Sequence, residues 1–200
     1  MDAVTNGKNE IQRTKFKTID LVYMAVGAIL LAVCSWISIP TTVPFTLQTF
    51  AVFTVLGLLG GKRGTVSIIV FILLGAIGVP VFHGFQGGFG VILGTTGGYI
   101  VGFIFMGLLY WLAEVLFKNI MRSTRFTAKT IAVRTAVMIV GLAVCYAFGT
   151  AWFMIAYAKG SGPVGLGVAL GWCVIPFILP DIAKMVLAMV ISARLKKYLK

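Results

Sequence analysis

The sequence predicts an all-α integral membrane protein with six transmembrane helices in a single membrane domain, residues 1–200. Hydrophobic residues make up 60% of the chain, which is more than a soluble core of this size can bury. Charged residues make up only 11%, and most of the basic ones gather in short clusters between long apolar runs. Because a helix needs about 20 residues to cross a bilayer, six crossings account for the chain.

Each predicted span is an apolar run bounded by polar, glycine-rich or proline-rich sequence. Residues 1–17 are polar and basic and lack the apolar core of a cleavable signal peptide, so we expect a cytoplasmic tail. Asp20 opens the first span, where an acid suits the helix dipole. The spans, between about residues 20 and 199, are expected at Asp20–Ile39, Thr46–Gly60, Thr65–Val79, Tyr99–Phe117, Thr135–Tyr157 and from near Pro180 onward. We expect Gly165–Val174 to be a separate interfacial or re-entrant piece, with Pro180 at the first position of the last helix and Asp181 in its first turn.

The basic residues set the orientation. Fifteen of the 17 Lys and Arg residues fall in four clusters, at residues 1–17, 62–63, 118–134 and 194–200. Six spans place all four clusters on one side, and the positive-inside rule makes that side the cytoplasm. The net charge of +12 is thereby explained by a lipid bilayer, without a nucleic acid partner. Both termini are expected in the cytoplasm, and the bacterial cytoplasmic membrane, the cell membrane of a multi-pass protein, is the simplest location.

The opposite, outer side is irregular and rich in proline and glycine. Residues 83–98 read HGFQGGFGVILGTTGG, and glycines such as Gly84 and Gly88 permit close backbone approach. This segment is either a flexible hairpin between two spans or a loop folded over a small ligand. The apolar walls of such a loop would be Phe82, Phe85, Phe89 and Tyr99. Irregular backbone at a membrane face usually lines a cavity, so we expect the site to open outward.

An acid and a base interrupt the long apolar stretch near the C-terminus. Asp181 and Lys184 are three residues apart, so on a helix they share a face. Each charge costs on the order of 3 kcal/mol inside a bilayer, which makes the pair the first candidate for function, although a purely structural pair is the alternative. The polar groups expected to converge on a small-molecule pocket in the outer half are Thr46, Gln48, Tyr99, Trp152, Asp181 and Lys184.

The sequence offers little for catalysis. His83 is the single histidine, no Gly-x-Ser-x-Gly elbow occurs, and the three cysteines have no metal-ligand spacing, so we expect neither an enzyme nor a metal or other cofactor. The Gly61-Lys62-Arg63 turn fails the phosphate-loop pattern because Arg63 stands where Ser or Thr is required. Ala28 and Ala32 form a small-xxx-small step, which suits either internal packing or an external partner helix.

Five stretches carry a family resemblance. They are Val43–Phe50 (VPFTLQTF), Gly75–Phe82 (GAIGVPVF), Gly87–Gly102 (GGFGVILGTTGGYIVG), Gly149–Trp152 (GTAW) and Pro176–Lys184 (PFILPDIAK). Together they resemble the BioY family, the biotin-binding S components of energy-coupling factor (ECF) transporters, and they come in that family's order over nearly the whole chain. Two departures lie in the loop: Thr95 stands where proline is common, and His83 where a small residue is usual.

The resemblance implies a six-helix S-component fold that captures biotin from outside. It further implies a shared energising module, a transmembrane coupling protein with two ATPase subunits, to which Ala28 and Ala32 would dock. Asp181 would accept from a ureido N–H of biotin, and Lys184 would donate to an oxygen of the ureido group or of the carboxylate. The remaining residues expected at the substrate are Thr46, Gln48, Phe82, Gly84, Gly88, Phe89, Tyr99 and Trp152. A stand-alone biotin carrier that works without ATPases, and a membrane enzyme on a lipid or peptide substrate, are the competing hypotheses.

Overall fold

A computed structural model describes residues 17–41, 43–121, 123, 127–196 and 198. Five long helices dominate it: α1 (Thr18–Trp36), α2 (Gln48–Ala76), α4 (Gly97–Leu116), α6 (Ala128–Ser161) and α8 (Ile175–Leu195). The short helical pieces are η1 (His83–Phe85), α3 (Phe89–Leu93), α5 (Lys118–Met121) and α7 (Leu166–Cys173). An antiparallel pair of two-residue strands, β1 (Ser38–Ile39) and β2 (Phe45–Thr46), joins α1 to α2, with Ser38 opposite Thr46.

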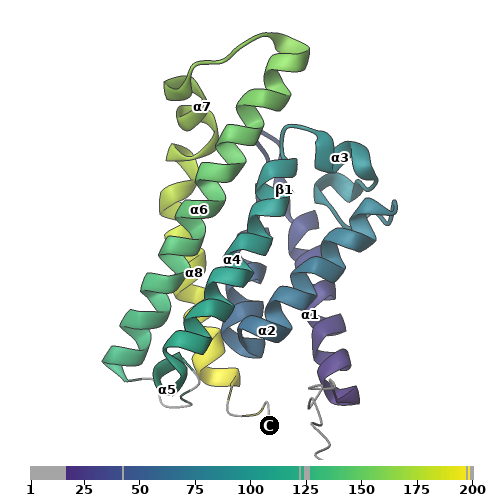
Figure 1. The fold of residues 1–200 in the computed structure, drawn as a ribbon. Helices are drawn as coiled ribbons and strands as arrows, with labels where there is room; N and C mark the ends of the chain where they lie inside the picture. The colour runs from purple at the N-terminus through teal and green to yellow at the C-terminus, as the bar shows by residue number, and fades with distance from the viewer. Residues whose placement is uncertain (1–16, 42, 122, 124–126, 197, 199–200) are drawn as a thin grey trace, which may run out of the picture.

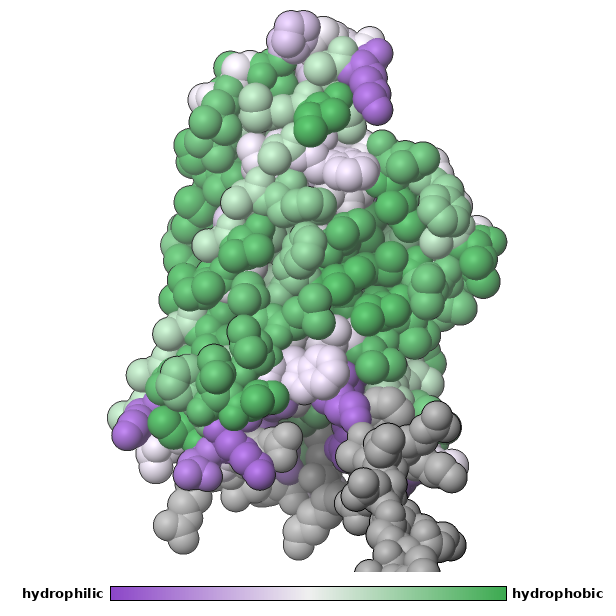
Figure 2. Space-filling view, viewed as in Figure 1, coloured by the Kyte–Doolittle hydropathy of each residue, from purple (hydrophilic) through white to green (hydrophobic). Residues whose placement is uncertain are grey.

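The long helices run side by side, and the chain enters α1 and leaves α8 at the same end of the molecule (Figure 1). The described residues contain five stretches long and apolar enough to cross a membrane, the last of which joins α7 and α8 into Leu166–Leu195. Apolar side chains cover most of the visible surface, whereas strongly hydrophilic ones gather near α5 and the start of α1 (Figure 2). An apolar belt with polar ends is the surface expected of a protein surrounded by lipid.

The second and third predicted spans both fall within α2, which turns back on itself at Gly60. Gly60 has φ +82° and ψ 175°, outside the helical region. A Cβ built on Gly64 would lie 3.2 Å from the Cα of Leu56, although eight residues of straight helix would separate these positions by about 12 Å. Glu114 of α4 closes the turn, because its Oε2 accepts the Gly61 N–H at 2.8 Å.

Two predicted boundaries are corrected by the structure. The last helix begins at Ile175, so Pro176 lies at its N-terminus, Pro180 lies inside it, and Asp181 is not in its first turn. The fifth predicted span lies in α6, which begins at Ala128 rather than Thr135, inside the basic cluster at 118–134. The separate piece expected at 165–174 corresponds to α7, and the predicted tail at 1–17 lies outside the described residues except for its last residue.

The small-residue face of α1 packs inside the protein. Ala28 and Ala32 are 5% and 6% exposed and belong to the hydrophobic core, and a Cβ on the neighbouring Gly27 would lie 2.6 Å from the Ser67 Oγ of α2. Close helix packing therefore explains these alanines within the described residues, and docking of an external protein at this face stays a prediction. The outward face of α1 instead carries large apolar side chains, among them Val22 and Ile29.

Two of the five stretches that resemble the BioY family pack directly on each other. A Cβ on Gly149 of α6 would lie 2.2 Å from Tyr99 Cδ1, and a Cβ on Gly98 of α4 would lie 2.3 Å from Trp152 Cβ. Each glycine thus makes room for an aromatic ring of the facing helix. Trp152 also donates its indole N–H to the Gly94 carbonyl at 3.0 Å, which ties the loop before α4 to α6.

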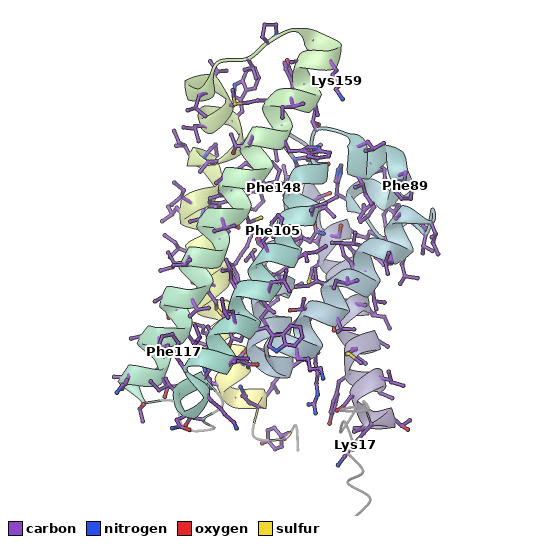
Figure 3. The ribbon with its side chains drawn as sticks, in the orientation of Figure 1. Lys17, Phe89, Phe105, Phe117, Phe148 and Lys159 are labelled. Atoms are coloured by element: carbon purple, nitrogen blue, oxygen red, sulfur yellow. The ribbon has the colours of Figure 1, made fainter. Side chains whose placement is uncertain are left out.

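The irregular segments lie at the end of the molecule opposite to the start of α1 and the end of α8. Figure 3 shows Lys17 and Phe117 near one end, and Phe89 and Lys159 toward the other. The second group lies with α3, with the upper end of α6 and with the connection to α7. The Trp36 indole N–H donates to the Pro80 carbonyl at 2.9 Å and so links the end of α1 to the segment that follows α2. The structure therefore has one end of short basic turns and one end of loops.

Candidate functional site

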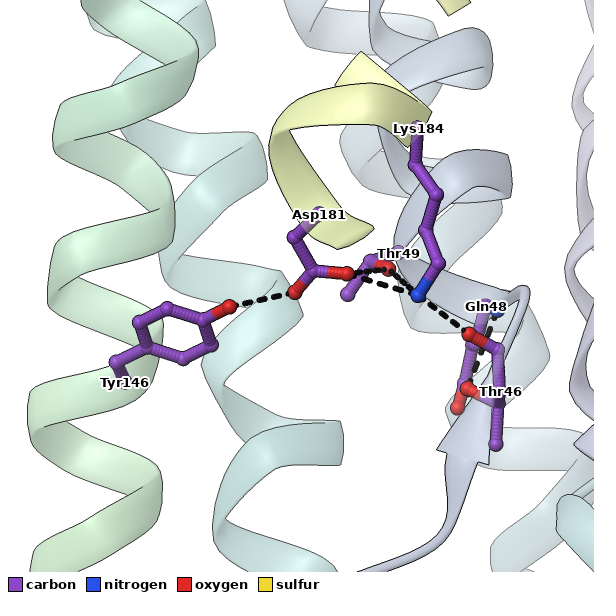
Figure 4. A network of polar contacts seen from close by, with 6 residues as sticks. All are labelled: Thr46, Gln48, Thr49, Tyr146, Asp181 and Lys184. Atoms are coloured by element: carbon purple, nitrogen blue, oxygen red, sulfur yellow. Dashed lines mark hydrogen bonds and ion pairs between the residues drawn. The ribbon is translucent and has the colours of Figure 1, made fainter. Parts of the chain in front are cut away.

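Asp181 and Lys184 form a buried ion pair on α8. Their side chains are 1% and 8% exposed, and Lys184 Nζ lies 2.8 Å from Asp181 Oδ1. The sequence spacing predicted that they share a helix face, and the structure confirms it. Because an isolated charge in such a place is costly, each is held by further polar groups (Figure 4).

Groups from three other elements complete this polar cluster. The Thr49 hydroxyl, at the start of α2, donates to Asp181 Oδ1 at 2.8 Å. The Tyr146 hydroxyl of α6 donates to Asp181 Oδ2 at 2.6 Å. Lys184 Nζ donates to the Thr46 carbonyl of β2 at 2.7 Å and to Thr49 Oγ1 at 3.1 Å. The cluster therefore joins α2, α6 and α8 with the strand pair near the looped end.

The number of hydrogen bonds that Lys184 and Asp181 can form shows which of their donors and acceptors remain for a ligand. A lysine ammonium has three N–H donors, and Lys184 uses them on Asp181, Thr46 and Thr49. Its Nζ also lies 4.2 Å from the ring centroid of Phe45. A carboxylate has about four acceptor sites, of which Asp181 uses two on Oδ1 and one on Oδ2. Asp181 Oδ2 can therefore accept one more hydrogen bond, whereas Lys184 has no donor to spare.

A pocket adjoins the cluster. Its polar lining comes from β2, the start of α2, η1, α4, α6 and α8, and its apolar lining comes mainly from α4, the residues before β2 and the first turn of α8. The cavity volume is about 70 Å³, several times what one water needs. The lining residues are Val43, Pro44, Thr46, Gln48, Thr49, His83, Thr96, Tyr99, Ile100, Phe103, Cys145, Tyr146, Cys173, Phe177, Asp181 and Lys184.

Gln48 presents an unpaired amide to this pocket. The residue is 6% exposed, and its Nε2 is buried without a hydrogen-bond partner among the described residues. Leaving a buried amide unpaired costs roughly 1–3 kcal/mol. Because Gln48 lines the pocket, its amide is available to a ligand group that accepts hydrogen bonds.

The structure brings half of the predicted substrate residues together. Thr46, Gln48, Tyr99, Asp181 and Lys184 all line the pocket. Tyr99 also donates to or accepts from Thr150 at 2.9 Å, which fixes its ring against α6.

The other predicted residues lie away from the pocket walls. Phe82 is 1% exposed and packs edge-on against Phe71 in the core. Gly84 and Gly88 have φ +64° and +97° and shape the turns around η1 and α3. Phe89 is 65% exposed, and Trp152 holds the loop through Gly94 as described above.

A shallower hollow opens beside the pocket at the looped end. It is lined by Thr41, Pro44, His83, Gln86, Gly90, Val91, Gly94, Thr95 and Thr96. Pro44, His83 and Thr96 belong to both linings, so the hollow is the mouth of the pocket. Partial burial lowers the pKa of the His83 imidazole below its ordinary value.

Sequence reasoning missed Thr49, Tyr146 and Phe177. Thr49 follows Gln48 directly within the stretch VPFTLQTF, and Phe177 lies in PFILPDIAK, so both were close to residues already chosen. Tyr146 is a phenol in the middle of an apolar helix, and a buried hydroxyl at that depth needs a partner. Across the described residues, no group of three His, Cys, Asp or Glu side chains lies together as metal ligands would.

Comparisons with known proteins give a consistent result. The model of the BioY family matches residues 9–200. The chain is 35% identical over 178 residues to a biotin transporter BioY of Thermotoga maritima, covering 88% of this chain and 95% of that protein. It is 36% identical over 183 residues to a probable biotin transporter BioY of Pyrococcus horikoshii, covering 91% and 98% respectively.

A solved structure shares the fold. It is the crystal structure of an S-component for biotin from an ECF-type ABC transporter, with a TM-score of 0.75 and 26% sequence identity. The superposition covers 92% of this chain and 95% of the other. The described helices are therefore arranged as in that S-component.

Proposed function

Because the chain belongs to the BioY family, we propose that it is the biotin-binding S component of an ECF transporter. Its relatives are named as biotin transporters, and the solved structure with the same fold is an S-component for biotin. The observation in this chain that carries the proposal is a pocket with apolar walls and one buried polar end, at Asp181, Thr49, Tyr146 and Gln48. A small-molecule site of that composition binds a ligand that is part ring and part polar.

The polar end suits the ureido group of biotin. A ureido group offers two N–H donors and one C=O acceptor. We propose that Asp181 Oδ2 accepts from one ureido N–H, because that oxygen retains an unused acceptor site. The Gln48 amide N–H then donates to the ureido oxygen. Lys184 pairs with Asp181 and links it to the Thr46 carbonyl, rather than contacting biotin through a free donor.

The apolar walls suit the rest of the ligand. Tyr99, Ile100, Phe103 and Phe177 line the pocket and can cover the fused thioether rings. The mouth at Thr96 and His83 faces the looped end, where the valerate tail would leave the rings. Biotin would thus bind with its rings inward and its tail outward.

The proposed transport cycle assigns no chemical step to this chain. Capture of biotin from the outer face would be followed by delivery inward, driven by a transmembrane coupling protein and two ATPase subunits that hydrolyse ATP. Uptake measured in cells with and without those partners tests this part. Loss of uptake without them agrees with the proposal, whereas undiminished uptake would favour the stand-alone carrier.

We further propose that a single membrane domain crosses the cell membrane six times, with both termini in the cytoplasm. The two arms of α2, on either side of Gly60, would count as separate crossings. The four basic clusters then share the inner side with α5, in agreement with the positive-inside rule. Single cysteines at Lys62 and Lys159, labelled from either side of the membrane, test this: the first should react only from the cytoplasm and the second only from outside.

The binding site itself is tested by titrating purified protein with biotin. Asp181→Asn removes the negative charge and should weaken biotin binding on the order of a hundredfold, since hydrogen bonds to charged groups contribute roughly 1.5–3 kcal/mol. The matched control is Asp20→Asn, because Asp20 is also mostly buried and ion-paired, to Arg63 at 2.6 Å, but lies on α1 outside the pocket. Equal affinity of wild type and Asp181→Asn would contradict the proposed site.

A further inference from the structure

The charged end of the pocket leaves one part of the proposed ligand without a partner. Asp181 and Lys184 neutralise each other at 2.8 Å, and every Lys184 donor is used within the protein. A carboxylate at the tail of the ligand therefore finds no free cation at this end. An anion brought into an apolar pocket needs a donor or a positive charge nearby.

His83 is the other basic side chain of the pocket. Of the described residues that line it, only Lys184 and His83 can carry a positive charge. His83 opens η1 and lines both the pocket and its mouth, beside Thr96. The structure gives its imidazole no hydrogen bond to any described residue, and neutral or protonated it has an N–H to donate.

We propose that His83 is a specificity-determining residue, whose imidazole donates a hydrogen bond at the pocket mouth to the carboxylate of the ligand's tail. This inference rests on the proposed function and deepens it. The ligand is then held at both ends, with its ureido group on Asp181 and Gln48 and its carboxylate on His83. The pocket would distinguish the free acid from neutral derivatives with the same rings.

The surroundings of His83 make this recognition depend on pH. The titratable and charged groups that share the pocket are Tyr99 of α4, Cys145 and Tyr146 of α6, Cys173 of α7, and Asp181 and Lys184 of α8. The Asp181–Lys184 pair has no net charge, and the described pocket offers His83 no free acid. In the empty pocket, burial lowers the pKa of His83, so the imidazole is mostly neutral at pH 7. A bound carboxylate favours the protonated form, and affinity for the acid should therefore rise as the pH falls.

The test compares biotin with biotin methyl ester, which has the same rings but an uncharged tail. Both are titrated into the purified full-length protein at about pH 5.5 and about pH 8, on either side of the ordinary histidine pKa of ~6.5. Wild type should bind the acid about tenfold more tightly than the ester at the lower pH, with a smaller difference at the higher pH. His83→Ala should abolish the difference and leave ester affinity unchanged.

Two further variants separate the possible causes of a preference for the acid over the ester. His83→Gln keeps an N–H donor without a titrating charge, so it should retain part of the preference for the acid at both pH values. Lys159→Gln removes an exposed lysine at the end of α6 that does not line the pocket, and it should leave the preference unchanged.

Three results would overturn the inference. His83→Ala with the wild-type preference would exclude the contact, as would a preference lost on Lys159→Gln, which would indicate long-range attraction. Failure of wild type to bind either ligand would overturn the proposed function itself, whereas tight binding of both ligands with no preference would overturn the role of His83 alone.

Discussion

Among single residues, Gln48 has a buried amide whose loss of hydration is not offset by a hydrogen bond to any described residue. Its amide is buried at the polar end of the pocket without a partner among the described residues. Buried polar groups are usually paired, so an unpaired one in a pocket indicates a group kept for a ligand. The neighbouring ion pair differs from Gln48, because Asp181 and Lys184 form most of the hydrogen bonds they can within the protein.

Gln48→Met separates binding from stability. We expect it to leave the melting temperature unchanged or raise it, because an unpaired buried amide is removed, while biotin affinity falls about tenfold or more with the lost hydrogen bond. Thr54→Val is the matched control, since Thr54 is another buried residue of α2 with an unpaired hydroxyl, but it does not line the pocket. Thermal denaturation and biotin titration in detergent measure both quantities. Undiminished biotin affinity in Gln48→Met would remove Gln48 from the site.

At the scale of helices, the packing of α4 on α6 positions a wall of the pocket. Gly149 leaves room for Tyr99, and Tyr99 lines the pocket while its hydroxyl meets Thr150. The stretches GTTGGY and GTAW are therefore linked because each contributes a glycine to one contact and an aromatic ring to the other.

Gly149→Ala should displace Tyr99 and weaken biotin binding about tenfold or more, because the new Cβ would lie 2.2 Å from the ring. Gly141→Ala on the same helix is the control, since its Cβ would lie 3.4 Å from Met106 Cα, an ordinary contact. Alanine is the better helix former by about 1 kcal/mol, so Gly141→Ala should be neutral or stabilising. Biotin titration and melting temperature check both, and equal affinities of the two variants would contradict the role of this packing.

Sequence patterns predicted the apolar runs and the charged pair, but not where each helix begins or which helices lie side by side. The last helix begins at Ile175 because Pro176, not Pro180, takes the N-terminal position, and either proline fits that position from sequence alone. From sequence alone Ala28 and Ala32 suited internal and external packing equally, and only the structure shows that they pack in the core. Tyr146 and Asp181 are 35 residues apart, and only the arrangement of α6 beside α8 brings them within 2.6 Å.

For the whole molecule, the two ends differ in the residues they carry. The end with the start of α1 and the end of α8 carries basic turns, and the end with the loops carries the pocket mouth (Figures 1 and 3). The polar cluster lies between them, and apolar side chains cover most of the face seen in Figure 2. A ligand that completes the bonding of Asp181 and Gln48 would therefore be drawn from the looped end into the membrane interior.

The most direct test of this account is a structure of the protein determined with biotin bound. We predict the fused rings beside Tyr99 and Phe177, with a ureido nitrogen within about 3 Å of Asp181 Oδ2 and the ureido oxygen at a similar distance from the Gln48 amide. Biotin bound elsewhere, or a pocket in which Asp181 meets only Lys184, Thr49 and Tyr146 while biotin is bound, would contradict it.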